Sequence, residues 1–380
     1  MTSHTQFTVL DPLNARSPAV RALLSPIGTL TWFKIAPVSL KNYPETTARA
    51  EAAFEFAKKK YTNRFMRLAK IALFKAQYNG SRKYFEKNRR TIAVCWNGLN
   101  GTRRVFANAA LDAGARTLYF ELCPFAGRIT VDPCGVNAAN SLPRNIEPYL
   151  KWAKSAKTND LKAFSDTIQA RKPVANKVRG AAERSLLEPF IFAPLQVPGD
   201  SQLRIFGGNF KTVEATIEGL SAAARSLPDG WHLRIKEHPS SPTSFHELFG
   251  RLAHPKIILD NETDTFAQVA ASRAVVTVNS SVGLEAMFFE KPVIALGDCF
   301  WALPGVADHC KDIAALTDRF AMPEDLSFDH AARNAFLSYL IEVYYPKLPE
   351  HGESMLPEEI EKIVMRLNGP DQFGFWSNQR

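Results

Sequence analysis

The sequence has 380 residues, 46% of them hydrophobic, which is enough for two domains of ordinary size, each with its own core. Five cysteines lie far apart with no C-x-x-C pair, so neither a disulfide framework nor a zinc site is indicated, and a reducing cytoplasm fits best. We also expect neither a standard secretion signal nor an integral membrane protein, because no charged-then-apolar leader and no apolar run of ~18 residues occurs.

The net charge of +9 is concentrated near the N-terminus. Residues 1–90 hold 17 Lys or Arg and 5 Asp or Glu, a balance of 17 − 5 = +12, which leaves 9 − 12 = −3 for the rest. Within 44–78 an apolar stripe recurs every three or four residues, which predicts a basic amphipathic helix. The stripe is Phe54, Ala57, Tyr61, Phe65, Leu68 and Ala72, and the basic residues beside it are Lys58, Lys59, Lys60, Arg64, Arg67 and Lys70.

Two interpretations of this helix remain open. It docks on an anionic membrane surface or an acidic acceptor, or it packs on its own domain with a solvated basic face. A nucleic-acid partner is not expected, because no zinc-finger spacing, aromatic RNP-like strand or helix-turn-helix pattern accompanies the charge.

Regular alternation of strands and helices begins at Thr91. "TIAVCWNG" predicts a buried strand, "GTRRVFANAALDAGA" a helix closed by Gly114, and "RTLYFEL" a second strand, which together form a βαβ unit. A loop rich in Gly, Pro and Asn follows over 127–144, and helical patterns run from Ile146 to about Gln169. The stretch 171–180, "RKPVANKVRG", is typical of a joint between domains.

A second series, in which short apolar strands alternate with single helices, follows the joint. The predicted strands are "PFIFAPLQ", "HLRIKEHP", "KIILD", "AVVTVNS" and "PVIAL", and the predicted helices are 212–226, 245–252, 265–271 and "VGLEAMFFE". This alternation predicts a parallel sheet covered on both faces. The expected fold class is therefore α/β, with two Rossmann-like domains whose parallel sheets face a cleft. The predicted parts are a basic, largely helical segment of the first domain (1–90), the first Rossmann-like domain (91–180), the second (181–365), and a tail returning to the first (366–380).

Three segments of the second domain each follow the carboxyl end of a strand, where open α/β sheets bind their ligands. In "KEHP", Lys236 and His238 supply two cations or donors of different reach, and Pro239 ends the strand. The placement predicts an anion site. The alternative is a strand end with solvated polar residues.

The other two segments add polar groups to the same edge. In 195–202, Gly199 permits a tight turn and Asp200 and Ser201 point polar atoms at the cleft. In "VNSSVGLEA" a strand passes directly into a helix, whose N-terminus suits a phosphate or carboxylate. The residues singled out there are Asn279, Ser280, Ser281, Gly283, which lets a ligand approach, and Glu285, which accepts from ribose hydroxyls or complements the helix dipole.

In this order, "PLQVPGDSQ", "KEHP" and "VNSSVGLEAMFFEKPVIALGD" resemble the capsule polysaccharide biosynthesis family, which includes the Kdo (3-deoxy-manno-octulosonate) transferases of bacterial capsules. "WNGLNGTRRVFANAALDAGARTLYFE" and "ITVDPCGVNAANSLPR" are similar to it as well, so the resemblance spans roughly 92–298. It implies a GT-B glycosyltransferase that transfers Kdo from CMP-Kdo to a lipid or saccharide acceptor, without a metal or other cofactor. It also implies a cytoplasmic enzyme, peripheral at the inner face of the membrane.

The resemblance also implies roles for the donor-side residues. Lys236 and His238 would contact the phosphate of CMP, Ser280 and Ser281 would complete that cradle, and Glu285 would hold the ribose.

Catalytic roles follow from the same resemblance. Related retaining Kdo transferases carry a catalytic carboxylate in a Q-x-D-x-S-like segment, which matches Gln196 and Asp200, although the spacing differs here. Asp200 would attack or electrostatically support the anomeric carbon. Glu121, at the end of a first-domain strand, is the candidate acid or base for the acceptor hydroxyl, and the alternative is a hydrogen-bond partner for the loop backbone.

Two other functions stay open. Members of this family are often described by their part in capsule export, so a GT-B shell that binds or scaffolds without catalysis is one alternative. A transferase that uses another nucleotide sugar is the other.

Overall fold

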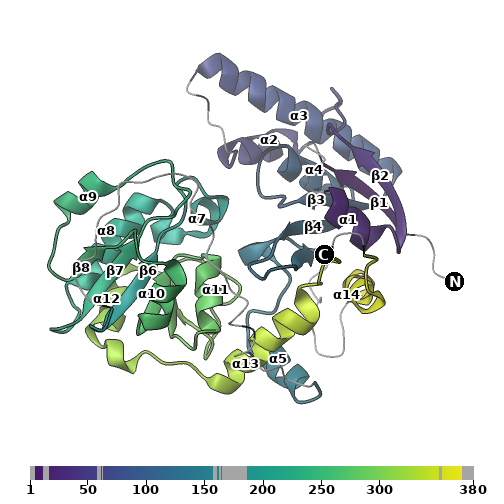
Figure 1. The fold of residues 1–380 in the computed structure, drawn as a ribbon. Helices are drawn as coiled ribbons and strands as arrows, with labels where there is room; N and C mark the ends of the chain where they lie inside the picture. Colours follow the sequence, from purple (N-terminus) through teal and green to yellow (C-terminus); the bar gives the residue numbers. More distant parts are fainter. Residues whose placement is uncertain are drawn as a thin grey trace. The chain divides into compact units, whose positions relative to one another are not determined.

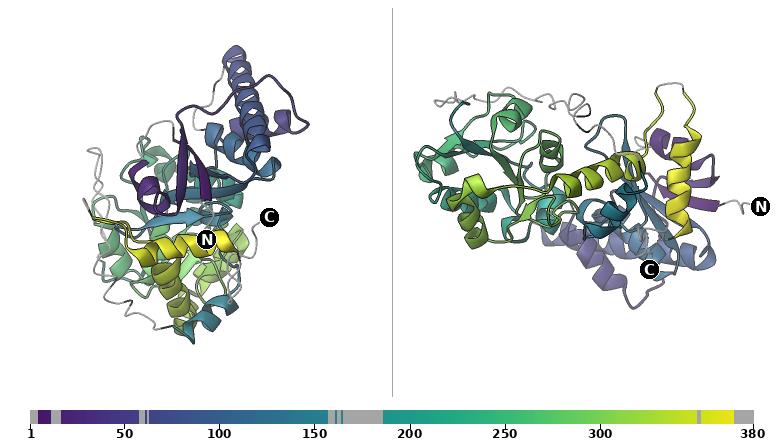
Figure 2. Two further views of the ribbon diagram at one scale, coloured as in Figure 1. Left: turned by 90° about the vertical axis from the view of Figure 1, so that its right-hand side faces the viewer. Right: turned by 90° about the horizontal axis from the view of Figure 1, so that it is seen from below.

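The computed structural model describes residues 5–11, 17–57, 61, 63–156, 161, 164, 186–350 and 353–369, which form two compact α/β units (Figures 1 and 2). The first unit comprises Met1–Leu142 and Leu340–Arg380, and the second comprises Pro143–Tyr339. The boundaries therefore differ from the predicted ones at 180 and 365. The predicted joint over 171–180 and the end of the chain from 370 lie outside the described residues.

The boundary shift has a packing cause in each unit. In the second unit, the rings of Tyr149 and Trp152 contact Tyr339 edge to face, so the segment after 142 belongs there. In the first unit, the Arg128 guanidinium donates to the carbonyls of Ile341 (2.6 Å) and Tyr345 (2.7 Å). This anchors the returning chain to the first sheet.

The first unit contains a five-stranded sheet in the order β2-β1-β3-β4-β5, in which β5 alone runs antiparallel to its neighbour. Its strands are β1 (Thr5–Leu10), β2 (Gly28–Phe33), β3 (Ile92–Trp96), β4 (Arg116–Leu122) and β5 (Ile129–Asp132). The expectation that 1–90 is largely helical was therefore incomplete, and the loop expected over 127–144 begins with a strand, β5. β1 lies between β2 and β3, and Phe7 and Val9 are buried in the core of this sheet.

Helices of the first unit form two groups. α2, α3 and α4 pack on one another, and α1 packs on α14. Their bounds are α1 (Ser17–Leu24), α2 (Thr46–Glu55), α3 (Arg64–Lys87), α4 (Gly101–Asp112), the short η1 (Asn137–Ala139), the π-helical η4 (Leu340–Tyr344) and α14 (Pro357–Asn368). None of the helices among the described residues is long and apolar enough to cross a bilayer.

The predicted amphipathic helix within 44–78 is two helices, α2 and α3. The break has a local cause: the Asn63 side chain accepts hydrogen bonds from the amides of Phe65 (2.8 Å) and Met66 (3.3 Å) and caps α3. The buried stripe of α3 includes Phe74, Tyr78 and Phe85, so it lies on other residues than predicted. Lys58, Lys59 and Lys60 lie outside the described residues.

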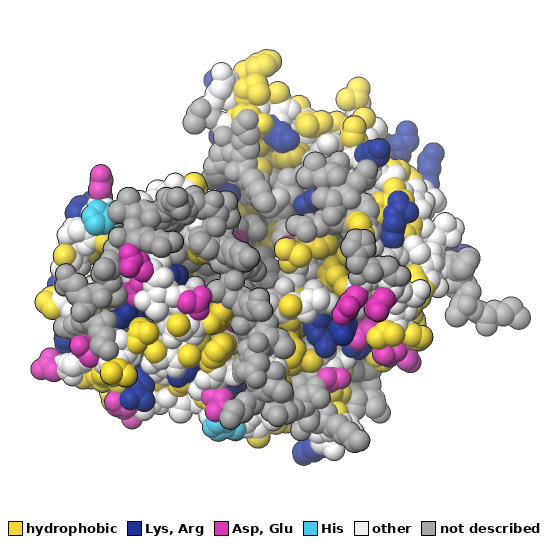
Figure 3. All heavy atoms as spheres, viewed as in Figure 1, with side chains coloured by type: hydrophobic (Ala, Val, Ile, Leu, Met, Phe, Trp, Pro, Cys, Tyr) yellow, Lys and Arg dark blue, Asp and Glu magenta, His cyan; other side chains and the backbone are white. Residues whose placement is uncertain are grey.

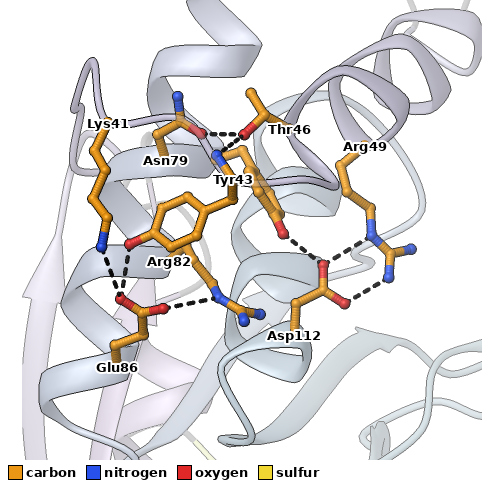
Figure 4. A network of polar contacts seen from close by, with 9 residues as sticks. Lys41, Tyr43, Thr46, Arg49, Asn79, Arg82, Glu86 and Asp112 are labelled. Atoms are coloured by element: carbon orange, nitrogen blue, oxygen red, sulfur yellow. Dashed lines mark hydrogen bonds and ion pairs between the residues drawn. The ribbon is translucent and has the colours of Figure 1, made fainter.

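Polar contacts anchor the C-terminal half of α3 to its neighbours (Figure 4). Glu86 accepts from the Tyr43 hydroxyl (2.8 Å) and from Arg82 (3.4 Å). On α4, Asp112 pairs with Arg49 of α2 at 2.6 Å and also accepts from the Tyr78 hydroxyl of α3 (2.7 Å). One carboxylate therefore ties three helices together.

The second unit contains a six-stranded, wholly parallel sheet in the order β11-β10-β9-β6-β7-β8. Its strands are β6 (Phe190–Pro194), β7 (His232–Lys236), β8 (Ile257–Leu259), β9 (Ala274–Thr277), β10 (Val293–Ala295) and β11 (Asp308–His309). This is the strand order of a doubly wound Rossmann domain, with its reversal between β6 and β9. The expected α/β class with two such domains is confirmed, except that the first sheet is mixed.

Most helices of the second unit connect strands of its sheet, as the alternation predicted, while the first precedes the sheet and the last three follow it. They are α5 (Glu147–Ala153), α7 (Ser201–Phe206), η2 (Gly208–Phe210), α8 (Val213–Ala224), α9 (His246–Arg251), α10 (Thr265–Ala271), α11 (Ser281–Met287), α12 (Ile313–Ala321), η3 (Pro323–Asp325) and α13 (His330–Tyr339). Ile217 and Leu220 of α8 and Leu316 and Phe320 of α12 pack in one apolar cluster with the strands.

A buried carboxylate organises the loop after β5. Asp132 accepts from the amides of Cys134 (2.8 Å) and Gly135 (3.1 Å), from the Ser141 hydroxyl (2.7 Å), and from the Tyr344 hydroxyl (3.1 Å). Burial raises the pKa of the Asp132 carboxyl, although the hydrogen bonds from Ser141, Cys134 and Gly135 act in the other direction. The same contacts bind the returning segment at Tyr344 to the first sheet.

A buried ion pair fixes the edge of the second sheet. Arg234 of β7 donates to Asp260 after β8 at 2.7 Å, and both side chains are almost fully buried. The other oxygen of Asp260 accepts from the amides of Glu262 (3.1 Å) and Thr263 (3.0 Å). Burial acts to raise the pKa of Asp260, but the bonds from Thr263, Arg234 and Glu262 together lower it below its ordinary value of 3.8.

Replacement of Asp132 by Ala is expected to lower the free energy of unfolding by about 3 kcal/mol or more, because several buried donors lose their acceptor. Ser141→Ala removes one hydroxyl donor and should cost about 1 kcal/mol. Urea titration followed by tryptophan fluorescence measures both. Equal midpoints for Asp132→Ala and the unmodified chain would contradict this account.

Replacement of Asp260 by Asn leaves the buried guanidinium of Arg234 without its charge partner, and should cost about 3 kcal/mol at neutral pH. Because the folded pKa of Asp260 is lowered, its contribution is present above the ordinary value of 3.8 and lost as the pH falls through the folded pKa. Urea unfolding across this range should show the two proteins converging in acid. Asp229→Asn, at an exposed surface pair with Lys256, is the control and should change little. A difference that stays constant with pH would refute the assignment.

Candidate functional site at the strand reversal of the second unit

The three predicted segments follow three neighbouring parallel strands. In the sheet, β6 lies between β9 and β7. The segment 195–200 follows β6, 237–239 follows β7, and 278–280 follows β9. Since the carboxyl ends of parallel strands share one edge of a sheet, the segments lie along one edge, as the sequence predicted. The order of strands reverses between β6 and β9, so the loops there diverge toward helices on opposite faces.

Two amide side chains join the loops across the reversal. The Gln196 side chain donates from Nε2 to the side-chain oxygen Oδ1 of Asn279 (3.0 Å). Its Oε1 accepts from the backbone N–H of Asn279 (3.2 Å). Asn279 Nδ2 also donates to the carbonyl of Gln202 (3.1 Å). Gln196 is buried, so these bonds fix the loop after β6 against the loop after β9.

Asp200 lies beside this pair. Its Oδ1 accepts from the amide of Gln202 (2.9 Å) and caps α7, while Gln196 Nε2 approaches Oδ2 at 3.4 Å. Gly199 has a φ of +80°, which the predicted tight turn requires and which favours glycine. Ser201 begins α7 and is half-buried. The structure therefore brings Gln196, Asp200 and Asn279 together.

The KEHP segment is held by its own hydrogen bonds. The Lys236 ammonium is buried and donates to the carbonyls of Asn261 (2.8 Å) and Thr263 (2.6 Å). Glu237 accepts from the Asn261 side chain (2.9 Å) and from the Phe245 amide (2.7 Å). The predicted phosphate contact of Lys236 must therefore compete with two carbonyls that it already holds.

His238 is half-buried at the start of a turn. Its Nδ1 accepts from the amide of Ser240 at 3.0 Å, so in the neutral ring the proton is on Nε2. The ring is thus oriented with Nε2 as a donor, the form that the predicted phosphate contact needs.

The segment after β9 caps α11. The Ser280 hydroxyl accepts from the Val282 amide (3.2 Å), and Ser281, the first helical residue, is half-buried. Gly283 does not open space for a ligand as expected: a Cβ there would lie 2.7 Å from the Trp301 ring, so the indole occupies that space. Glu285 is buried in the second turn, and no structural feature tests its predicted contact with ribose.

Glu121 belongs to the first unit. Its Oε1 accepts from the Trp96 indole (3.1 Å) and from the Leu122 amide (2.8 Å), and its Oε2 accepts from the Asn97 side chain (2.5 Å). These bonds hold the loop after β3, where Asn97 has a φ of +64°. Glu121 is thus a hydrogen-bond partner for two side chains at the end of β3 and for the backbone of β4, rather than for loop backbone, and the acid or base role stays a prediction.

Sequence reasoning missed Glu237, Asn261 and Asp132, which hold the loops by buried hydrogen bonds. Asp132 alone had a local signature, because an Asp before Pro-Cys-Gly is typical of an Asx turn.

In the described part of the chain, no group of three or more His, Cys, Asp or Glu side chains is placed to hold a metal ion. Burial raises the pKa of the Cys299 thiol, next to Asp298, well above its ordinary range.

Known proteins resemble this chain in sequence. Residues 154–345 match the family model described as "Capsule polysaccharide biosynthesis protein". Protein FixF of Sinorhizobium fredii is 30% identical over 260 residues, which cover 67% of this chain and 60% of FixF. Capsule polysaccharide export protein KpsS of Escherichia coli is 24% identical over 230 residues, 47% of this chain and 59% of KpsS. The chain thus spans about 60% of the length of these curated relatives.

The fold is shared with a solved structure. KpsC of Thermosulfurimonas dismutans, titled a beta Kdo 2,7 transferase, superimposes with a TM-score of 0.53 at 14% identity, and the match covers 95% of this chain and 99% of that chain. The two α/β units are therefore those of a GT-B fold. With half of its residues matched by the family model, the chain belongs to the capsule polysaccharide biosynthesis protein family.

Proposed function

We propose that the chain is a glycosyltransferase of capsular polysaccharide biosynthesis that transfers Kdo from CMP-Kdo to a lipid or saccharide acceptor. The observation that carries the proposal is the exchange of hydrogen bonds between Gln196 and Asn279 at the reversal of the second sheet, beside Asp200. Doubly wound sheets bind nucleotides at this reversal. The family supports the pathway, and the fold shared with a β-Kdo transferase supports the choice of sugar.

The reaction needs opposite charges on its two sides. The bond between the anomeric carbon and a phosphate oxygen of CMP breaks, and CMP leaves with the bonding electrons. The oxygen of the acceptor hydroxyl bonds to that carbon, and its proton passes to a base. Negative charge grows on the phosphate while the sugar becomes cation-like. Donors are therefore needed at the phosphate and a carboxylate at the sugar.

The residues at the edge supply both kinds of group. His238 donates from Nε2 to the phosphate, and Ser281 adds a second donor. Asp200 supports the anomeric carbon, either by attack or by its charge. Lys236 adds positive charge while its ammonium holds the loop after β8, which makes it a positioning residue in this proposal.

His238→Ala should lower turnover of CMP-Kdo by about 100-fold while the unfolding transition stays unchanged, because it removes a donor to the leaving phosphate. His254→Ala is the matched control. His254 Nδ1 also accepts an amide two residues on, that of Lys256 at 3.3 Å, but His254 precedes β8 at the amino end of its strand. Radiolabelled transfer assays measure both variants. Equal turnover of His238→Ala and the unmodified chain would discard the assignment.

Asp200→Asn should keep the cap of α7, because Asn is as good a capping residue, and should keep CMP binding. Its turnover should fall by about 100-fold or more, because the charge at the sugar is lost. Calorimetry with CMP and transfer assays separate the two effects. Asp312→Asn, at the cap of α12, is the control. Unchanged turnover in Asp200→Asn would remove Asp200 from the chemistry.

A non-catalytic role in export is the second candidate, favoured by the likeness to KpsS, an export protein by name. Calorimetry and product analysis with a panel of nucleotide sugars distinguish the candidates. Binding of CMP-Kdo with turnover supports the enzyme, and binding without turnover supports the scaffold. Turnover of another nucleotide sugar alone would change the donor.

A further inference from the structure

The N-terminal half of α3 exposes an apolar face. Residues 63–69 are all exposed, and Phe65 is 76% exposed, Leu68 56% and Leu73 42%. At 3.6 residues per turn, Phe65, Ala69, Ala72 and Ala76 line one side of the helix, with Leu68 and Leu73 flanking it. This side is opposite the one through which Phe74, Tyr78 and Phe85 are buried, so the helix presents hydrophobic groups away from its own domain.

The segment that follows β2 extends this face. The Ser39 amide donates to the carbonyl of Ala76 (2.9 Å), and a Cβ on Gly80 would lie 2.3 Å from the Pro37 backbone, so this segment crosses α3 at its outward side. Three of its hydrophobic side chains are exposed, namely Ile35, Val38 and Leu40. Together, Ile35, Val38, Leu40, Phe65, Met66, Leu68 and Leu73 form what we call the α3 surface.

The α3 surface gathers half of the exposed large hydrophobic side chains in the described part of the chain, seven of fourteen. Figure 3 shows hydrophobic side chains at the top of the view, where Figure 1 places α3, with Lys and Arg beside them. Exposed hydrophobic residues are ordinary when scattered, but a gathered patch marks an interaction surface.

The charge beside the α3 surface is mainly positive, although Lys41 is paired with Glu86 at 3.7 Å. Residues 56–85 contain no Asp or Glu. Arg64 and Lys75 lie along one edge of the apolar side of α3, and Lys70 lies along the other. Lys34 and Lys41 are exposed on the crossing segment. An apolar strip bordered by cations fits a surface that is anionic outside and apolar beneath.

We propose that the α3 surface docks on an anionic lipid bilayer. Phe65, Leu68 and Leu73 enter the boundary between headgroups and acyl chains, and Arg64 and Lys75 contact the anionic headgroups. A second copy of the chain is a poorer occupant. In a symmetric dimer the basic edges of the two copies would face each other across the interface and repel. The C-terminal half of α3 is anchored by the Glu86 and Asp112 contacts (Figure 4), so the surface is presented by a rigid helix.

Vesicle flotation of the full chain tests the proposal. The chain should bind vesicles of phosphatidylcholine with about 30% phosphatidylglycerol, and should bind pure phosphatidylcholine at least about tenfold more weakly. Phe65→Ser with Leu68→Ser should lower the partition coefficient about tenfold, because apolar area no longer leaves water. Arg64→Glu with Lys75→Glu should remove the preference for the anionic lipid.

Matched pairs elsewhere on the surface serve as controls. Met322→Ser with Leu356→Ser changes two exposed hydrophobic residues, and Lys211→Glu with Arg225→Glu reverses two exposed charges. Both pairs should bind vesicles like the unmodified chain, and urea midpoints should be equal throughout. Equal binding to both kinds of vesicle, or equal losses in the test and control pairs, would overturn the proposal. A dimer in ultracentrifugation that Phe65→Ser with Leu68→Ser dissociates, without an effect on vesicles, would assign the α3 surface to a second copy.

Discussion

The hydrogen bonds between Gln196 and Asn279 are the constraint on which the candidate site depends. They join two loops that parallel-sheet geometry otherwise sends apart, because right-handed connections carry the chain from β6 and β9 to opposite faces. Both bonds involve the buried side chain of Gln196. Breaking either bond would leave a buried donor or acceptor that water cannot reach to replace the lost partner. The positions of Asp200 and of the α11 cap follow from this pair.

Most charged side chains near the site are buried and hold the loops in place, whereas His238 is only half-buried. Arg234 and Asp260 form a buried pair, and Lys236 and Glu237 hold the loop after β8 through backbone and amide groups. A buried ion is costly unless it is paired or hydrogen-bonded, which explains why each of these four side chains bonds to a partner. The Nδ1 of His238 accepts from the Ser240 amide, which orients the ring with Nε2 as a donor suited to an anion.

The first unit shows how one helix serves two purposes. The C-terminal half of α3 is tied to its neighbours by carboxylates that accept from several donors each, whereas its first two turns, residues 64–70, contribute no buried side chain to the core. The packing interpretation of the basic helix therefore applies to the C-terminal half, and the exposed N-terminal part is where we propose an outside partner. The N-terminal half exposes large hydrophobic side chains on its outward side, where a helix that only faces solvent would carry polar ones.

The sequence by itself determined the α/β class, most of the strands and helices from Thr91 to Leu296, and the three segments at one sheet edge. Short apolar strands followed by single helices leave few topologies, and parallel strands end at the same edge. It did not reveal β1, β2 and β5 as sheet strands, or the return of 340–369 to the first unit. It also did not reveal that the Trp301 ring fills the space beside Gly283. It also did not reveal which polar side chains have hydrogen-bond partners within the protein. Only the tertiary structure decided these. Whether Lys236 or Glu121 bonds to a ligand or to a partner within the protein depends on residues brought near by folding, and residue type and spacing do not reveal those neighbours.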